Sequence, residues 1–298
     1  MERLLFFWAV AFGVLLTLTL VVCLFPAVAN NDNNKHLNSQ KDSKSPFREK
    51  CADCHADEIA YQEWHSSNHK HALVNLIEGK YETKDSCLGC HSAGYTKFSS
   101  GEWRSQHGKL TLATAVNAVS CSSCHLHSSK RENYLTKNPK TLCTSCHKMD
   151  CGCAGAGVVH QSQSEMFMGR LGAGVKTMPA KHAKIMKKRC IYCHMAKDDT
   201  KTVAKHGGHT FKADYSTCSR CHENMDTKIK QYRIDIRKKM AEVKTVLDSA
   251  TNLESKAYKD AKLNYDMVNG DAGFGMHNPL YAQALLDYAL TLESEIVK

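Results

Sequence analysis

Aromatic residues are scarce in this chain of 298 residues, since tryptophan, tyrosine and phenylalanine together make up only 8%. Between residues 30 and 225 there is also no long apolar segment of the kind that builds a protein core. Proline occurs only 5 times and glycine 17 times, which excludes collagen-like sequence and extensive disorder. We therefore expect something other than side chains to fill much of the interior.

Charged residues are missing from residues 4–25, an apolar run that follows Arg3. Ala27, Val28 and Ala29 come next and lead into a polar stretch. This layout predicts an export signal over 1–29 that is cleaved after Ala29. The same run is long enough to anchor the chain in a membrane if it is retained. In both cases the remaining chain is expected to work in the periplasm or another extracytoplasmic space.

Cysteine is abundant, at 15 residues, and in an exported protein this number would ordinarily indicate a disulfide framework. The spacing indicates another use, because twelve of the cysteines form six CxxC pairs and a histidine directly follows each pair. The motifs are Cys51/Cys54-His55, Cys87/Cys90-His91, Cys121/Cys124-His125, Cys143/Cys146-His147, Cys190/Cys193-His194 and Cys218/Cys221-His222.

The CxxCH spacing is typical of covalent haem attachment. Both thiols add to the vinyl groups of one haem, and the adjoining histidine binds the iron as its proximal ligand. Zinc sites instead share two CxxC pairs around one ion, and a redox CxxC would occur once. Composition alone predicts about 0.04 CxxCH matches in such a chain. The sequence therefore predicts six covalently attached haems c.

This haem content explains two features of the composition. The 269 residues from 30 to 298 leave about 45 per haem, so we expect the porphyrins to form much of the apolar interior. The formal charge of +10 is offset by propionates, because a ferric haem with two ionised propionates carries about −1. We expect no nucleic-acid partner.

The motifs begin at residues 51, 87, 121, 143, 190 and 218, with no fixed period, which excludes a solenoid. We expect a mainly α multihaem cytochrome c fold with little regular structure around packed haems. Residues 30–46 are read as a flexible lead-in, 47–223 as the hexahaem-binding region and 224–298 as a C-terminal helical region. Helical periodicity predicts one long helix after residue 224, with a break near 249–252, and another helix from Pro279. These helices are expected to pack within the chain, and an interface with a second copy is the alternative.

Saturated haem irons need a second axial ligand, and histidine is the usual choice in low-potential electron carriers. Seventeen histidines minus the six in motifs leave eleven, so the supply exceeds the need for six distal ligands. The number alone does not separate a fully saturated set from one with an open iron. The candidates are His36, His65, His69, His71, His107, His127, His160, His182, His206, His209 and His277.

Four further elements stand out: Trp64-x-x-Ser67-x-His69, the fifth haem motif followed by Met195, His209-Thr210-Phe211 and Gly275-Met276-His277-Asn278-Pro279. Together they resemble the multihaem cytochrome superfamily of ammonia-forming nitrite reductase, hydroxylamine oxidoreductase and the tetrahaem cytochrome of nitrifiers. The resemblance implies that His277 binds the fifth haem and His182 the sixth. It implies His209 for the third haem, with His206 as the alternative, and His69 for the fourth, with His71 as the next candidate. It leaves His107 and His127 for the first or second haem, and His65 as a neighbour that packs or binds a propionate.

The same resemblance raises the alternative of an enzyme. His160 lies in a stretch similar to the one that brings an active-site histidine over the open haem of the reductases, which by order is the second haem here. Those reductases commonly have a lysine in the place of His91, and Cys151-Gly152-Cys153 occupies the region of their tyrosine. Cys151 and Cys153 fit a strained disulfide, a thiolate ligand to haem or to an added metal, or plain thiols.

Two functions follow from these residues. The first is an exported cytochrome that carries electrons through bis-histidine haems between redox partners, such as other cytochromes or a membrane quinol dehydrogenase. The second is an oxidoreductase that acts on nitrite, hydroxylamine or sulfite at an open second haem, with His160, Cys151 and Cys153 as catalytic candidates.

Overall fold

A computed structural model describes residues 50–79, 82–94, 96–97, 103–105, 108–149, 159–197 and 199–298. Residues 43–298 form one compact unit. The predicted signal or anchor over 1–29 and the lead-in over 30–46 lie outside the described residues. Within the described part, no helix combines the length and the apolar character needed to cross a membrane.

The haem-motif region is built from short helices, as the sequence predicted. In chain order they are α2 (Ala52–His55), α3 (Ile59–His65), η2 (Asn68–His71), α4 (Ala72–Ile77), η3 (Asp85–Cys87), α5 (Leu88–His91), α6 (Cys121–Cys124), η4 (Glu132–Tyr134), α7 (Pro139–Leu142), η5 (Cys143–Ser145), α8 (Gln163–Met168), α9 (Lys181–Ile185), α10 (Cys190–His194), η6 (Gly208–Thr210) and η7 (Tyr215–Arg220).

A small antiparallel sheet follows the second motif and was not predicted. Its strands are β1 (Thr96–Lys97), β2 (Trp103–Ser105) and β3 (Gly108–Lys109), in the order β1-β2-β3. The strands are two or three residues long, too short to show an alternating apolar pattern in the sequence. The mainly α fold class is nonetheless confirmed.

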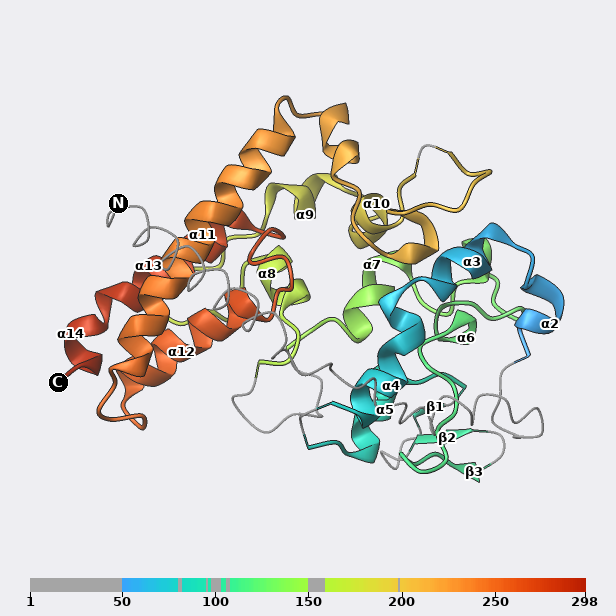
Figure 1. The fold of residues 1–298 in the computed structure, drawn as a ribbon, viewed down its shortest axis with the longest axis horizontal. Coiled ribbons are helices and arrows are strands. Elements are labelled where there is room, and N and C mark those ends of the chain that lie inside the picture. Colours follow the sequence, from blue (N-terminus) through green and yellow to red (C-terminus); the bar gives the residue numbers. More distant parts are fainter. Residues whose placement is uncertain are drawn as a thin grey trace, which may run out of the picture. The chain divides into compact units, whose positions relative to one another are not determined.

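The C-terminal region contains the long helices α11 (Met225–Asp248), α12 (Lys256–Asn269) and α13 (Pro279–Thr291), and the short α14 (Glu293–Ile296). Figure 1 shows α11, α12 and α13 in orange and red, and all three pairs are in contact. The predicted break near 249–252 and the predicted start at Pro279 are both confirmed. Asn278 caps α13 by accepting a hydrogen bond from the backbone N–H of Tyr281.

Most buried apolar side chains belong to this helical region. Its core includes Ile236, Val243, Met267, Tyr281 and Leu285, all essentially without exposed surface. The haem-motif region has a second, much smaller buried cluster, made of Leu73, Leu88, Leu110 and Ala118. This imbalance agrees with the expectation that cofactors supply much of the apolar interior there.

Candidate haem-binding site

Each CxxC pair lies on or beside a single helical turn, with the motif histidine at the end of that turn. Cys190 to His194, for example, form α10, and the N–H of His125 donates to the carbonyl of Cys121 at 2.7 Å. One turn places both sulfurs on one side of the backbone, which is the arrangement that attachment to one porphyrin edge requires. The cysteine thiols of the structure stand for the thioether sulfurs of an attached haem.

Two motif cysteines are more exposed than the others. Cys54 of the first motif and Cys221 of the sixth are exposed, whereas the other ten motif cysteines are half-buried. A thioether bond needs an accessible thiol and not a buried one, so haem attachment at both stays a prediction.

Each motif histidine lies opposite one histidine from elsewhere in the chain. The ring centres are between 5.9 and 6.1 Å apart in all six pairs. The pairs are His55 with His127, His91 with His160, His125 with His209, His147 with His69, His194 with His277, and His222 with His182.

This spacing fits an iron between the two rings. Bonds from a metal to histidine nitrogen are about 2 Å long, so two rings on opposite sides of one iron have centres about 6 Å apart. Five of the rings also use Nδ1 for another contact, which directs Nε2 toward the partner ring. These are His55 to Glu58 at 2.7 Å, His91 to the Ala72 carbonyl at 3.1 Å, His125 to Asn133 O at 2.7 Å, His194 to Phe211 O at 2.9 Å and His277 to Asp271 at 2.6 Å.

Burial favours the neutral form of several of these imidazoles, which leaves a nitrogen lone pair for a metal. It lowers the pKa of His69 to about 4. Burial likewise lowers the pKa of His147, His194 and His209. At His277 burial also acts to lower the pKa, but the adjacent Asp271 carboxylate outweighs it and the pKa is raised.

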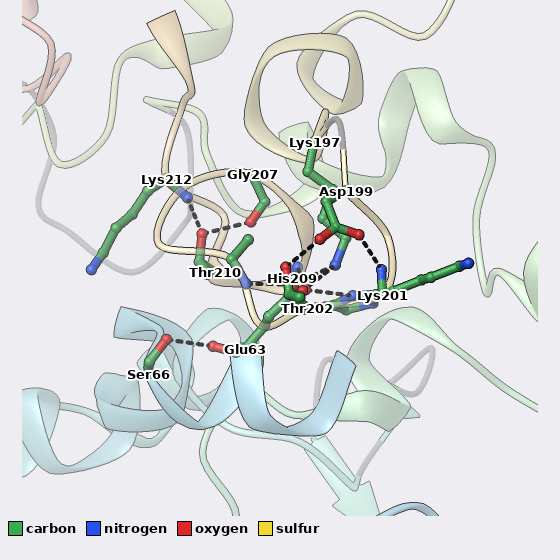
Figure 2. Close-up of polar contacts among 11 residues, drawn as sticks. Glu63, Ser66, Lys197, Asp199, Lys201, Thr202, Gly207, His209, Thr210 and Lys212 are labelled. Carbon is green, nitrogen blue, oxygen red and sulfur yellow. Dashed lines mark hydrogen bonds and ion pairs between the residues drawn. The ribbon is translucent and has the colours of Figure 1, made fainter. Parts of the chain in front are cut away.

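The loop that carries His209 is held by Glu63, a carboxylate of α3 with only 1% of its surface exposed (Figure 2). Glu63 accepts hydrogen bonds from Lys197 Nζ at 2.5 Å, from the N–H of Ala204 at 3.0 Å and from the N–H of His209 at 2.8 Å. Burial acts to raise the pKa of Glu63, but these hydrogen bonds outweigh it, so the pKa is lowered. A buried charge thus fixes the backbone of the third-site histidine.

Gly208 makes this approach of backbone to carboxylate feasible. Its φ is +54°, in the left-handed region, and a Cβ at this position would lie 2.2 Å from Glu63 Oε2. Phe211, three residues on, connects neighbouring sites. Its ring centre is 4.4 Å from that of His69 and 5.8 Å from that of His209, while its carbonyl accepts the hydrogen bond from His194.

The cysteine sulfurs of successive motifs approach one another in a definite order. Cys143 of the fourth motif and Cys190 of the fifth are within hydrogen-bonding reach, and so are Cys90 of the second motif and Cys146. Weaker electrostatic contacts join Cys146 to Cys124 of the third motif and join the fifth motif to the sixth through Cys193 and Cys218.

Ser67, two residues before His69, is fully buried, and its hydroxyl has no hydrogen-bond partner within the described part of the chain.

Other predicted residues have different surroundings. His65 packs against Tyr61 and Trp64, as expected for a neighbour that is not a ligand, and the exposed His71 and His206 form no such ring pair within the described residues. His36, His107, Cys151 and Cys153 lie outside the described residues. Where the structure describes the chain, no three His, Cys, Asp or Glu side chains converge as a bare metal ion would require.

Sequence reasoning missed the supporting residues Glu63 and Asp271. A signal exists for each, because Glu63 directly precedes the Trp64 element and Asp271 stands six residues before His277. Neither spacing reveals that the carboxylate is buried, and only the fold supplies that information.

Comparison with known proteins points to one class. The model of the doubled CXXCH motif family matches residues 45–95 and 114–150. The outer cell wall cytochrome OcwA is 30% identical, with a TM-score of 0.65, over 78% of this chain and 50% of its own. The chain thus spans about half the length of that cytochrome. A search of curated proteins gave no match.

One more distant structure shares the fold. The undecahaem cytochrome from the S-layer of Carboxydothermus ferrireducens is 22% identical, with a TM-score of 0.60, over 77% of this chain and 40% of its own. The cytochrome c nitrite reductase of Desulfovibrio desulfuricans is 13% identical, with a TM-score of 0.46, over 77% of this chain and 70% of its own, and is too distant to bear on function.

Proposed function

Because this chain belongs to the multihaem c-type cytochromes, we propose that it carries electrons between redox partners through six haems c with two histidine ligands each. Haem c supplies one-electron redox chemistry when it is bound. The chain contributes attachment, axial ligands and the surroundings that set each potential. The observation that carries this proposal is that every motif histidine faces a second histidine at ligand spacing.

In this proposal the twelve motif cysteines attach the haems and the six motif histidines are the proximal ligands. The distal ligands, from the first haem to the sixth, are His127, His160, His209, His69, His277 and His182. The assignment gives His160 a ligand role in place of the catalytic role considered from the sequence. It needs no ligand from His107. With both axial positions taken at all six sites, no iron is left open for a substrate, which favours electron transfer over catalysis.

Adjacent attachment sites suit electron transfer. Cys143 of the fourth motif lies beside Cys190 of the fifth, and Cys90 of the second motif lies beside Cys146 of the fourth. The distal histidines of the first, second and sixth sites, His127, His160 and His182, are exposed. At the first and sixth sites the attachment cysteines Cys54 and Cys221 are exposed as well. Those three sites are therefore the proposed points of contact with redox proteins such as other cytochromes or a membrane quinol dehydrogenase.

We further propose that the protein works outside the cytoplasm. Two of the similar structures are named for an outer cell wall and an S-layer. The apolar run at 4–25, read as an export signal or anchor, agrees with such a location.

The test of the ligand set uses His160→Ala with His206→Ala as its matched control. Electron paramagnetic resonance of the oxidised wild type should show six low-spin haems and no high-spin signal that responds to nitrite, hydroxylamine or sulfite. His160→Ala should convert one haem to high spin and let it bind such ligands, whereas His206→Ala should not. A wild-type protein with a ligand-responsive high-spin haem, unchanged in His160→Ala, would refute the proposal and favour the enzyme.

A further inference from the structure

Asp271 is a fully buried carboxylate in contact with one proposed ligand. Its side chain has no exposed surface. Oδ1 accepts a hydrogen bond from Nδ1 of His277 at 2.6 Å, and Oδ2 accepts one from the N–H of Gly275 at 2.8 Å. The turn that makes this possible depends on Gly275, whose φ is +79° and where a Cβ would lie 2.3 Å from Ala282. Both oxygens are therefore fixed by the fold.

The other proposed ligands with a known Nδ1 partner have weaker acceptors. His91, His125 and His194 donate to backbone carbonyls, which carry no net charge. His55 contacts Glu58, but the side chains of this pair are 42% and 58% exposed, so water screens the charge. Among the described residues, the fifth site alone combines hydrogen-bond distance, a full negative charge and complete burial.

The charge of Asp271 is not neutralised by a basic side chain. Its ion pair within the described residues is with the ring of His277. This differs from Glu63, which lies 4.0 Å from Nδ1 of His209 but is paired with the ammonium group of Lys197. A buried carboxylate without a cation is costly, so the balancing positive charge has to come from the metal side of His277.

Because of this requirement, the two oxidation states of an iron at the fifth site differ in stability. Reduction adds one electron and removes one unit of positive charge, while the Asp271 carboxylate stays in place. The carboxylate therefore stabilises the ferric form more than the ferrous form, and hydrogen bonding of this kind also makes the histidine a stronger electron donor. Both effects lower the reduction potential.

We propose that Asp271 makes the fifth haem the last of the six to be reduced. This inference rests on the proposed ligand pair of His194 and His277. Cys190 of the fifth motif lies beside Cys143 of the fourth. An electron that passes from the fourth haem to the fifth therefore crosses an unfavourable step.

The experiment is a potentiometric titration of the holoprotein followed by electron paramagnetic resonance. His277→Ala identifies the low-spin signal of the fifth haem as the one that it removes. In the wild type this signal should be the last to vanish as the potential is lowered. In Asp271→Asn the amide oxygen can accept from His277 while the amide NH₂ group faces the N–H of Gly275. Loss of the charge should make the signal vanish at a more positive potential and change its g values, with the other five signals unmoved. Glu58→Gln should shift the first haem less, because that pair is exposed.

The outcomes separate this inference from the function on which it rests. The inference is overturned if another haem of the wild type is reduced after the fifth haem, as identified by His277→Ala. This outcome can be observed without any Asp271 variant. The inference is also overturned if Asp271→Asn keeps six low-spin haems and unchanged potentials. The ligand proposal itself fails if His277→Ala removes no low-spin signal. If the charge is the cause, Asp271→Glu, which keeps the carboxylate, should have a lower fifth-haem potential than Asp271→Asn.

Discussion

Replacing Glu63 by glutamine tests whether a buried carboxylate positions the distal ligand of the third haem. Lys197 Nζ and the N–H of Ala204 donate to Oε1, and the N–H of His209 donates to Oε2. Glutamine has one acceptor oxygen and one NH₂ group, so it cannot accept at both places. Keeping the oxygen toward Lys197 turns the NH₂ group against the N–H of His209. We therefore expect the variant to displace His209.

The magnitude follows from the groups left unpaired. A hydrogen bond to a charged group contributes about 1.5–3 kcal/mol, and an unsatisfied buried N–H costs about 1–3 kcal/mol. Removing one partner of a fully buried ion pair costs about 3–5 kcal/mol. Lys197 is 15% exposed and also donates to the Thr202 carbonyl, which reduces the loss. We expect Glu63→Gln to lower the free energy of unfolding by about 3 kcal/mol.

The assay is guanidinium unfolding followed by haem absorbance, together with electron paramagnetic resonance of the native variant. The denaturant midpoint should fall, and the low-spin signal that His209→Ala removes should broaden or convert to high spin. Glu254→Gln serves as control, because Glu254 is 86% exposed in its pair with Lys259 and should leave both measurements unchanged. A Glu63→Gln protein with the wild-type midpoint and six unaltered low-spin signals would refute the reasoning.

Two more substitutions probe the supports of the fold. Gly208→Ala should perturb the third haem as Glu63→Gln does, because the added Cβ would lie 2.2 Å from Glu63 Oε2 at a φ of +54°. Gly273→Ala is the control, since the nearest neighbour of a Cβ there is a side-chain atom 3.2 Å away. A Gly273→Ala protein that is equally perturbed would contradict this reasoning. Asn264→Ala should lower the free energy of unfolding by about 3 kcal/mol, measured from the denaturant midpoint, as it leaves the N–H and the carbonyl of Ala173 unpaired and removes a second hydrogen bond to the Leu285 carbonyl. Its haem spectra should match the wild type, and altered spectra would show that the helical region controls the ligands.

The helices could be predicted where side-chain periodicity alone determines them. In α11 the apolar positions recur every three or four residues, and Ile229, Ile236, Met240 and Val243 are buried as that pattern requires. The break after Asp248 and the start of α13 at Pro279 also follow local signals. The strands β1 to β3 could not be predicted, because two or three residues carry no period and their pairing depends on contacts across turns.

The ligand pairs illustrate the limits of local signals in another way. A CxxCH motif is complete within five residues, so attachment and proximal ligand can be read directly from the sequence. A distal histidine belongs to a haem far away in the chain, and the fourth and fifth motifs lie between His125 and its partner His209. Spacing cannot match such partners, so the resemblance to a known superfamily was needed to favour His69, His182, His209 and His277. The structure brings each of these to the motif histidine that the resemblance implied.

Exposure of an attachment site is equally invisible in the motif. Cys54 and Cys221 have the same spacing to their histidines as the ten half-buried motif cysteines, yet the structure leaves these two exposed. The difference comes from which other segments pack over each turn, and that is decided by residues far away in the chain.

Buried charge explains why the supporting residues escape sequence reasoning. Glu63 and Asp271 are ordinary acidic residues in a chain with 30 of them, and surface positions are the usual place for such side chains. Their significance comes from complete burial, which makes an ion pair or hydrogen bond strong and its absence costly. Burial of this kind depends on segments that are distant in sequence, such as Glu63 and Lys197, which are 134 residues apart.

Cofactor and polypeptide therefore divide the task of stabilising this fold. The helices α11 to α14 bury a large apolar cluster of their own, whereas residues 50–223 bury few apolar side chains outside a cluster of four. Ordering a chain costs conformational entropy at every residue, and so few contacts cannot offset that cost over such a length. In the proposed ligand set, apolar porphyrin surface and paired axial bonds would offset it, because each histidine pair joins segments far apart in the sequence and so closes a long loop. Glu63, Gly208 and Phe211 lie on one short loop and one facing helix, beside His69, His194 and His209. A single loop there has to serve the ligands of three neighbouring sites at once.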